Sequence, residues 1–225
     1  MGDVELRVLD DPSAAAAELL AEAARAGGHV ALAGGSTVGA AYRTTAALFP
    51  DWSGLEVWLG DERAVPPDDE RSNYRLVRET LLDLLETPPA AVHRVEGELG
   101  AVEAARRYDE ALEDVTLDLA LNGIGPDGHT ASLFPQARTL DERERRAVAA
   151  EAGLEPFVAR VTLTPPVFDA TALLVYLVTG AAKAEAVQRA FAEEPSPATP
   201  ASLVRGRRTI ALLDRAAAIR LPQVS

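Results

Sequence analysis

The chain of 225 residues carries 22 lysine and arginine residues against 35 aspartate and glutamate residues, a formal net charge of −13. That charge excludes a general field that attracts nucleic acid, and the absence of cysteine excludes disulfides, thiolate nucleophiles and cysteine-ligated metal centres. No apolar run approaches the ~20 residues of a membrane span, and the N-terminal sequence lacks the basic and apolar parts of a signal peptide. We therefore expect a cytoplasmic protein without membrane or nucleic-acid partners.

The length suits one domain, because single α/β domains often reach this size, and we expect one domain over residues 1–225. Hydrophobic residues make up 48% of the chain and charged residues 25%, which is typical of a globular protein. Lys183 is the only lysine, so the remaining 22 − 1 = 21 basic residues are arginines. A single lysine among arginines suggests that position 183 needs a compact ammonium group. The alternative is a surface lysine without a function in an arginine-rich chain.

In the first part of the chain, apolar strands alternate with helices. An Asp-Pro-Ser start predicts the cap of the first helix, and two glycines end it. In chain order, the pattern predicts a strand at Val4–Leu9, a helix from Asp11 to Arg25, a strand at His29–Ala33, a glycine-rich turn at 34–37, a helix at Val38–Phe49, a strand at Leu55–Leu59, a loop from Gly60 to Ser72 and a helix at Asn73–Leu85.

The second part continues the alternation and ends with a proline-rich loop before the last strand. The pattern predicts a helix at Val102–Leu112, a strand at Leu117–Leu121, a loop at Asn122–His129, strands at Val158–Leu163 and Leu173–Val178, a helix at Ala181–Ala192, a loop at Glu193–Pro200 and a strand at Thr209–Leu213. Strands separated by helices favour an α/β fold with a mostly parallel sheet and helices on both faces. Ligands of such sheets bind at the carboxyl ends of the strands.

The first candidate loop, Gly34-Gly35-Ser36-Thr37, lies between a strand and a helix. Two glycines allow close approach of the backbone, and the hydroxyls and helical N–H groups can hold a phosphate. The turn matches neither the GxxxxGK[ST] nor the GxGxxG fingerprint, so nucleoside triphosphates and dinucleotides are not indicated. An ordinary helix cap fits the same residues.

The second candidate loop places Asp61 and Arg63 directly after a strand. Arg63 suits bidentate pairing with a phosphate, and Asp61 suits orienting a catalytic group or binding a sugar hydroxyl. A solvated charge run is the alternative. We interpret the neighbouring stretch 68–71 as solvated surface, with Arg71 a weaker candidate for a phosphate contact.

The third candidate loop, 122–130, is rich in glycine and delivers His129 to the carboxyl edge of the sheet. A histidine there can act as a general base near neutral pH. We interpret His29 and His93 as structural or exposed. The three histidines are scattered and lack HxxxH or HxH spacing, which disfavours a metal site. The sequence also lacks a GxSxG elbow, so a serine triad is not indicated.

Together these loops resemble the 6-phosphogluconolactonase family over about Ala31 to Ala218, within a wider group that includes glucosamine-6-phosphate deaminase. The resemblance implies a modified doubly wound, Rossmann-like fold. Val38 departs from the family's usual proline and Arg71 from its frequent acidic residue. The segments that carry the resemblance are LAGGSTVGAAYR, VWLGDERAVPPDDERSNYRLVRETLL, LDLALNGIGPDGHTASLFP, RVTLTPPVFDATALLVYLVTGAAKAEAV and PASLVRGRRTIALLDRAAA, of which GDERAVP and GIGPDGHTASLFP are the most specific.

The resemblance implies hydrolysis of 6-phospho-D-glucono-1,5-lactone, the second step of the oxidative pentose phosphate pathway. It assigns His129 as the base that activates water, with Asp61 supporting it, and requires no cofactor or metal. Residues expected to bind the substrate or its phosphate are Gly34, Gly35, Ser36, Thr37, Arg63, Asn122, Gly123, Gly125, Asp127, Gly128 and Lys183.

Two other functions remain open. A deaminase or aldose–ketose isomerase acting on glucosamine 6-phosphate would move a proton between C1 and C2, but the residues after GH read TASLFP here, whereas the deaminases resemble GHIAFNEP. A non-catalytic sugar-phosphate sensor would keep the pocket without the reaction. For the lactonase we expect a small-molecule substrate and a monomer or weak homo-oligomer.

Overall fold

The computed structural model describes residues 4–153 and 155–222, and its main element is a seven-stranded sheet in the order β1-β10-β9-β6-β2-β3-β5. Every neighbouring pair in this sheet is parallel. Its strands are β1 (Val4–Val8), β2 (Gly28–Leu32), β3 (Leu55–Leu59), β5 (Ala91–His93), β6 (Leu119–Asn122), β9 (Leu173–Val178) and β10 (Arg208–Leu213).

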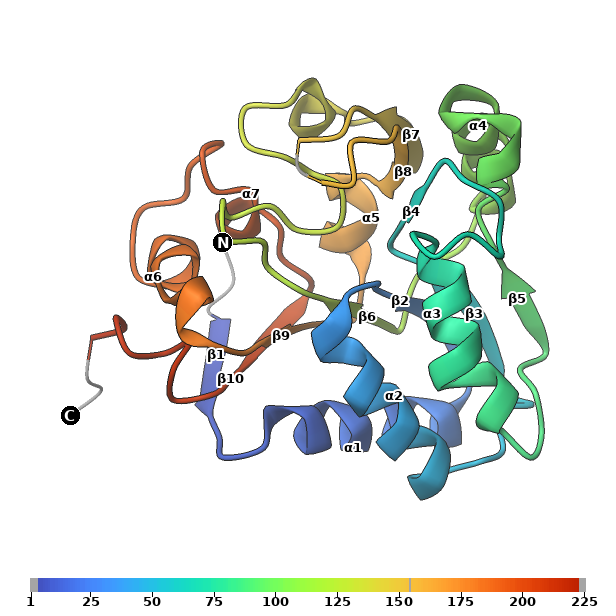
Figure 1. Ribbon diagram of the computed structural model, residues 1–225, viewed down its shortest axis with the longest axis horizontal. Helices are drawn as coiled ribbons and strands as arrows, with labels where there is room; N and C mark the ends of the chain where they lie inside the picture. Colours follow the sequence, from blue (N-terminus) through green and yellow to red (C-terminus); the bar gives the residue numbers. More distant parts are fainter. Residues whose placement is uncertain (1–3, 154, 223–225) are drawn as a thin grey trace.

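A second, three-stranded antiparallel sheet lies beside the first. It consists of β4 (Asp61–Arg63), β8 (Arg160–Leu163) and β7 (Ala147–Ala150) in that order. Only Gly60 separates β4 from the end of β3, so the small sheet begins at the carboxyl edge of the large one. Figure 1 shows β4, β7 and β8 above the large sheet, next to α4 and α5.

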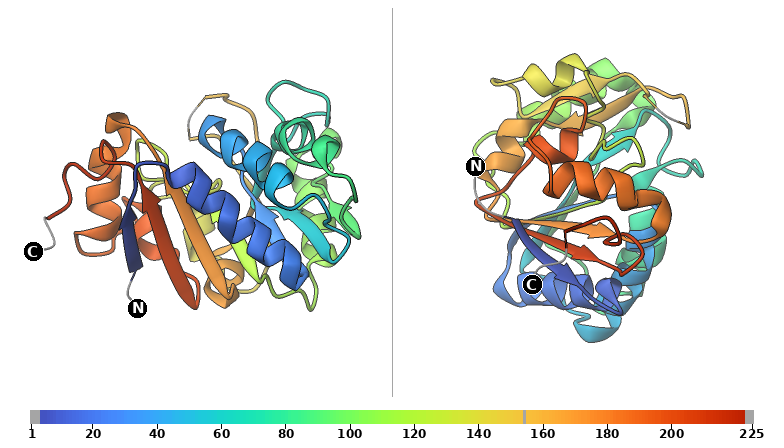
Figure 2. Two further views of the ribbon diagram at one scale, coloured as in Figure 1. Left: turned by 90° about the horizontal axis from the view of Figure 1, so that it is seen from below. Right: turned by 90° about the vertical axis from the view of Figure 1, so that its left-hand side faces the viewer.

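Helices cover both faces of the large sheet, as Figures 1 and 2 show. Alternate strand residues point to opposite faces, which divides the core in two. One half packs under α1 (Pro12–Ala26), α2 (Ser36–Leu48) and α3 (Asn73–Thr80), and the other under α4 (Ala101–Ala111), α5 (Pro165–Ala170), α6 (Ala184–Phe191) and α7 (Pro200–Leu203). Short 3-10 helices lie at Leu82–Leu84, Gly97–Leu99, Arg138–Asp141 and Ala181–Lys183.

The predicted fold class is confirmed: the sheet is parallel and covered by helices on both faces. The strands at Leu55–Leu59 and Leu173–Val178 have the predicted bounds. The helix predicted for Asn73–Leu85 was too long, because α3 ends at Thr80 and a 3-10 turn follows. The predicted strand at 117–121 begins and ends later, so Asn122 closes β6 rather than opening a loop.

The loop predicted for Gly60–Ser72 was wrong in part, since it contains β4. Asp61–Arg63 has no apolar alternation, and the segment is extended because it pairs with β8. The sequence pattern also missed β5, β7, α5 and α7, which have three to six residues each and are too short for a periodic signal.

Residues 1–3, 154 and 223–225 of the expected domain, including the start of the segment examined for a signal peptide, lie outside the described residues. No helix in the described ranges has the length and apolar character needed to span a bilayer.

The order of the strands sets the position of the loops. From β2 the chain adds β3 and β5 on one side, whereas β6, β9 and β10 lie on the other. Because the strands are parallel, the carboxyl ends of β3, β2, β6 and β9 meet at one edge, around the point where the order reverses. All three candidate loops, and the segment that leads to Lys183, start from these four strands.

Candidate active site

A cavity of about 230 Å³ opens at this carboxyl edge. It brings together most of the residues predicted from the sequence, although they come from four separate strands. The predicted residues that line it are Gly34, Gly35, Thr37, Asp61, Arg63, Gly123, Gly125, His129 and Lys183. The side chain of Ser36 lies outside the described part of the chain, and Ser36 itself is the first residue of α2.

His129 is paired with Asp127. The Nδ1 atom of His129 lies 2.6 Å from Oδ1 of Asp127, and the same oxygen accepts the backbone N–H of His129 at 3.2 Å. Burial favours the neutral acid of Asp127, but the hydrogen bonds and charge of His129 outweigh it, so the pKa of Asp127 lies below its usual value. The carboxylate therefore accepts from Nδ1–H, and Nε2 has no hydrogen-bond partner in the part of the chain that the structure describes.

Two glycines fix the loop that carries this pair. A Cβ at Gly125 would lie 2.0 Å from Nδ1 of His129 and 2.6 Å from Oδ1 of Asp127, so any side chain there would displace the pair. Gly128 has a φ of 94°, and its N–H donates to the carbonyl of Gly125 at 3.0 Å. The loop needs glycine at both positions for steric and conformational reasons.

No hydrogen bond or ion pair joins Asp61 to His129 in the described structure; Asp61 organises two other side chains. The hydroxyl of Ser132 donates to Oδ2 of Asp61 at 2.5 Å, and Nδ2 of Asn73 donates to Oδ1 at 3.0 Å and to the backbone carbonyl at 2.9 Å. Both Asp61 and Asn73 are buried. The carboxylate that orients His129 is thus Asp127, which lies two residues before it in the chain, rather than Asp61.

Arg63 and Arg160 lie side by side at the wall of the cavity. They are directly opposite each other in the antiparallel β4–β8 pair, and both line the cavity. Arg63 donates to the carbonyl of Arg71 at 2.5 Å, and no carboxylate forms a salt bridge with it in the described ranges. Burial lowers the pKa of Arg160, the charge of Asp61 raises it and that of Arg63 lowers it further. Two arginines on one wall of a cavity are suited to binding an anion.

Arg160 was not among the predicted site residues. It was read as part of an apolar strand, and its position beside Arg63 depends on the pairing of β4 with β8. The sequence pattern gave no signal for that pairing, because β4 was expected to be a loop. Asn73 and Thr179 also line the cavity without having been predicted.

The glycine turn and Lys183 lie at another part of the cavity wall. The hydroxyl of Thr37, in the first turn of α2, is 3.4 Å from that of Thr179, which follows β9. Gly35 has a φ of 111°, and no atom lies within 4 Å of the place a Cβ would take, so its backbone faces open space. Burial lowers the pKa of Lys183, although the charge of Asp127 raises it. Lys183 thus lines the same cavity as His129, and the charge of Asp127 acts on it.

Asp127, although paired with His129, does not itself line the cavity, and three further predicted or candidate residues also lie outside its lining. Asn122 is buried at the end of β6, and its Nδ2 has no partner among the described residues. Arg71 pairs with Asp69 through two hydrogen bonds of 2.8 and 2.6 Å, so its guanidinium is already held. Gly128 packs against Thr199, 2.8 Å from the place a Cβ would take.

The other two histidines lie together, away from the cavity lining. Nδ1 of His29 accepts the indole N–H of Trp58 at 3.2 Å, and His93 stacks on the same indole with ring centres 3.8 Å apart. Nε2 of His93 is 2.7 Å from Glu56. These contacts agree with a structural role. Residues 4–153 and 155–222 contain no group of three or more His, Asp or Glu side chains that could hold a metal ion.

Comparison with known proteins gives one family. A family model described as glucosamine-6-phosphate isomerases/6-phosphogluconolactonase matches residues 7–212. A 6-phosphogluconolactonase of Homo sapiens is 38% identical over 194 residues, which cover 81% of this chain and 75% of the human protein.

Solved structures agree with this fold. A 6-phosphogluconolactonase of Trypanosoma brucei superposes with a TM-score of 0.86 at 26% identity, over 99% of this chain and 100% of that one. A monomeric glucosamine-6-phosphate deaminase superposes with a TM-score of 0.84 at 21% identity, over 97% and 99% of the two chains. At that identity the second likeness shows the fold alone.

Proposed function

The chain belongs to the glucosamine-6-phosphate isomerase/6-phosphogluconolactonase family, and from this we propose that it hydrolyses 6-phospho-D-glucono-1,5-lactone to 6-phospho-D-gluconate. The observation that carries the proposal is that His129, held by Asp127, lines a cavity that Arg63, Arg160 and Lys183 also line. A histidine base beside several cations suits water attack on an anionic substrate. The named relatives support the lactone as that substrate.

His129 acts as the general base. Nε2 accepts a proton from water while the water oxygen forms a bond to C1 of the lactone. The tetrahedral intermediate then collapses, the bond between C1 and the ring oxygen breaks, and the imidazolium returns its proton to that oxygen. One water is consumed and a carboxylic acid is formed, which ionises at neutral pH. General-base catalysis of this kind contributes roughly 10²–10⁴-fold.

Asp127 supports both halves of this cycle. Its carboxylate holds the proton on Nδ1, which leaves the lone pair of Nε2 for water. The same negative charge stabilises the imidazolium that forms when water attacks. Asp61 has a different part, because it is bonded to Ser132 and Asn73; it holds the wall of the cavity in place.

The phosphate binds to the cations and to the turn at the start of α2. Lys183, Arg63 and Arg160 supply positive charge, and Gly35 and Thr37 supply backbone and hydroxyl donors. The protein carries a net charge of −13, so these local cations must attract the substrate against the overall field. Binding the phosphate fixes the lactone so that C1 lies near Nε2 of His129.

Two further features complete the proposal. We propose that the protein works in the cytoplasm and without nucleic-acid partners; its formal net charge of −13 fits the second point. We propose a monomer or weak homo-oligomer, which size-exclusion chromatography with light scattering at several protein concentrations would measure.

The activity is tested by the rate of acid production from freshly made 6-phosphogluconolactone, compared with spontaneous hydrolysis. We expect the wild type to exceed the background clearly and His129→Ala to lose at least about a hundredfold in kcat. His93→Ala is the matched control: it removes an imidazole that is stacked on Trp58 and should keep its turnover.

Three outcomes would contradict the proposal. A wild type no faster than the background would exclude the lactonase. Release of ammonia from glucosamine 6-phosphate would indicate the deaminase. Binding of 6-phosphogluconate without turnover of any sugar phosphate would indicate a sensor.

A further inference from the structure

Phe134 lies behind the cavity and contacts two of the groups that line it. It follows the turn in which the N–H of Leu133 donates to the carbonyl of Thr130 at 3.0 Å, and only 4% of its surface is exposed. It does not line the cavity itself. The mechanism above gives this side chain no task, although it belongs to the segment that carries His129.

The phenyl ring packs against the imidazole of His129. The two ring centres are 4.8 Å apart and the planes are inclined by 42°. The hydrogen bond that Nδ1–H donates to Asp127 holds one side of the imidazole, but a single bond leaves the ring free to tilt about it, since the second side-chain torsion of histidine has a broad minimum. The phenyl contact removes this freedom. It therefore fixes the direction in which Nε2 points.

The same ring contacts Arg160 by a cation–π interaction. The guanidinium carbon of Arg160 lies 5.4 Å from the ring centre, and Arg160 is only 3% exposed. A buried guanidinium loses much of its hydration, and an aromatic face compensates part of that loss. His129 follows β6 of the large sheet, whereas Arg160 is the first residue of β8 in the small sheet. Phe134 is therefore a direct physical link between the base and one of the two arginines at the cavity wall.

The ring has little room to move. A Cβ at Gly153 would lie 2.5, 2.6 and 3.1 Å from three atoms of the phenyl ring, which means that the backbone of Gly153 packs directly on it. Phe134 is thus held by the connection between β7 and β8, while it contacts His129 and Arg160. A ring confined in this way can hold both groups at a fixed separation.

We propose that Phe134 is a positioning residue that sets the orientation of the His129 imidazole and the Arg160 guanidinium together. The proposal rests on the lactonase function proposed above. Its consequence is that loss of the ring lowers turnover and anion binding at once, although Phe134 contacts neither water nor substrate.

The test compares Phe134→Leu, Phe134→Tyr and Phe168→Leu. Phe168 is fully buried in α5, so its leucine variant measures the effect of the same loss of volume at another core position. For Phe134→Leu we expect about a tenfold fall in kcat on the lactone and a comparable weakening of 6-phosphogluconate binding by calorimetry. Phe134→Tyr keeps the aromatic face and should stay within about threefold in both quantities, since the face makes both contacts. Phe168→Leu should lower only the melting temperature.

Each other outcome decides against the proposal. A fall in only one of the two quantities would exclude the coupling, and equal impairment of the folded leucine and tyrosine variants would exclude the aromatic face as its cause. If Phe134→Leu does not fold, Phe134→Met, which has a flexible side chain of similar volume, takes its place. A wild type that does not hydrolyse the lactone would refute the proposed function and this inference with it, whereas an active wild type with an unimpaired Phe134→Leu would refute only the inference.

Discussion

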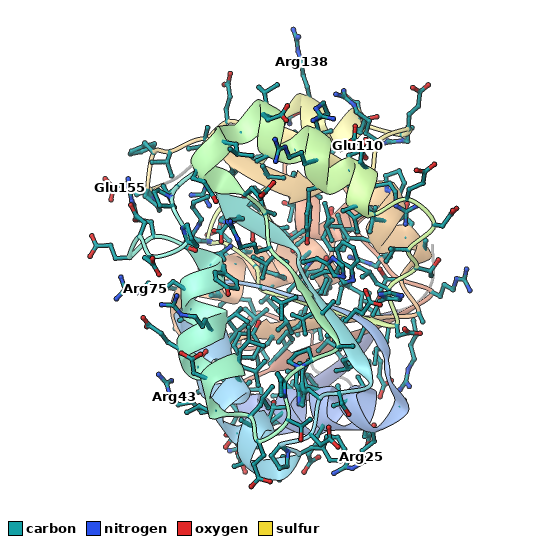
Figure 3. All side chains as sticks on the ribbon, turned by 90° about the vertical axis from the view of Figure 1, so that its right-hand side faces the viewer. Arg25, Arg43, Arg75, Glu110, Arg138 and Glu155 are labelled. Atoms are coloured by element: carbon teal, nitrogen blue, oxygen red, sulfur yellow. The ribbon has the colours of Figure 1, made fainter. Side chains whose placement is uncertain are left out.

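The charged side chains on the outer faces of α3 and α4 differ from those around the cavity in how they are paired. On the outside, arginines lie between carboxylates one helical turn away: Arg75 bonds Glu79 at 2.7 Å, and Arg106 and Arg107 both bond Glu103, at 2.7 and 2.8 Å. Figure 3 shows Arg75 and Arg138 pointing away from the molecule. Around the cavity, neither the guanidinium of Arg63 nor the ammonium of Lys183 forms a salt bridge with a carboxylate among the described residues.

We infer that this difference separates charges that serve solubility and local helix structure from charges that serve a ligand. Exposed pairs stabilise a protein by about 0–1 kcal/mol each, because water and salt screen them. A half-buried cation without a partner is unfavourable until an anion arrives. We infer that the cavity groups have been kept for the substrate at some cost to the free protein. Substitutions around the cavity should therefore lower activity with little loss of stability, whereas substitutions on the outer helix faces should leave activity unchanged.

The largest expected effect is that of Asp127→Asn. An amide cannot hold the proton on Nδ1 of His129 as a carboxylate does, and it no longer stabilises the imidazolium. We expect kcat to fall by about a hundredfold or more, with little change in KM, measured on fresh lactone over the background rate.

The control for that variant is Glu103→Gln on the outer face of α4. It removes a carboxylate that two arginines share, and its kcat should equal that of the wild type. A fall in kcat for Glu103→Gln, or wild-type turnover for Asp127→Asn, would contradict the division between the two regions.

A smaller effect is expected for Lys183→Met. Burial lowers the pKa of Lys183, so the charged form is less favourable in the folded than in the unfolded state. A lysine whose folded pKa is depressed opposes folding at pH values below that pKa, and methionine removes the opposition. We expect KM for the lactone to rise about tenfold or more while the melting temperature stays the same or rises.

Arg107→Met is the matched control for this variant. Arg107 is exposed and bonds Glu96 and Glu103, so its loss should leave KM unchanged. Should the melting temperature of Lys183→Met fall by several degrees with KM unchanged, Lys183 would have a structural part instead.

Much of the site could be predicted from the sequence because each of its loops follows a strand directly. Gly34, Asp61 and Gly123 lie within two positions of the end of a strand, and His129 belongs to the same loop as Gly123; parallel strands bring such loops to one edge. The carboxylate that orients His129 was two residues away in the predicted loop, yet Asp61 was preferred as its support. Proximity in sequence could not show which oxygen reaches Nδ1.

Arg160, Asn73 and Phe134 could not be placed at or behind the cavity from the sequence for another reason. Each depends on a contact between distant segments: β8 with β4, α3 with Asp61, and the loop at Gly153 with the phenyl ring. Short strands such as β4 have no periodic signal, and their pairing is fixed by the rest of the fold. Chemistry carried by single loops was therefore predictable, and chemistry carried by pairs of segments was not.

The smallest expected effect separates folding from catalysis within the site itself. Glu62 lies between Asp61 and Arg63 but is buried, and its two oxygens accept from the backbone N–H groups of Arg63, Asn73 and Tyr74 and from the hydroxyl of Ser72. Burial raises the pKa of Glu62, and the four donors act in the opposite direction. All its partners belong to the protein, so Glu62 holds the start of α3 against β4 and does not serve the ligand.

In Glu62→Gln an amide NH₂ replaces one oxygen, and each oxygen faces at least one backbone N–H. Whichever way the amide turns, a buried donor meets another donor. We expect the free energy of unfolding to fall by about 1–3 kcal/mol, measured by urea denaturation, with kcat of the folded fraction nearly unchanged. The same substitution at Glu103, whose side chain keeps 40% of its surface exposed, should cost less than about 0.5 kcal/mol. Equal costs at the two positions would show that burial and backbone donors do not distinguish the carboxylates, whereas a large fall in kcat for Glu62→Gln would place Glu62 with the ligand-serving groups.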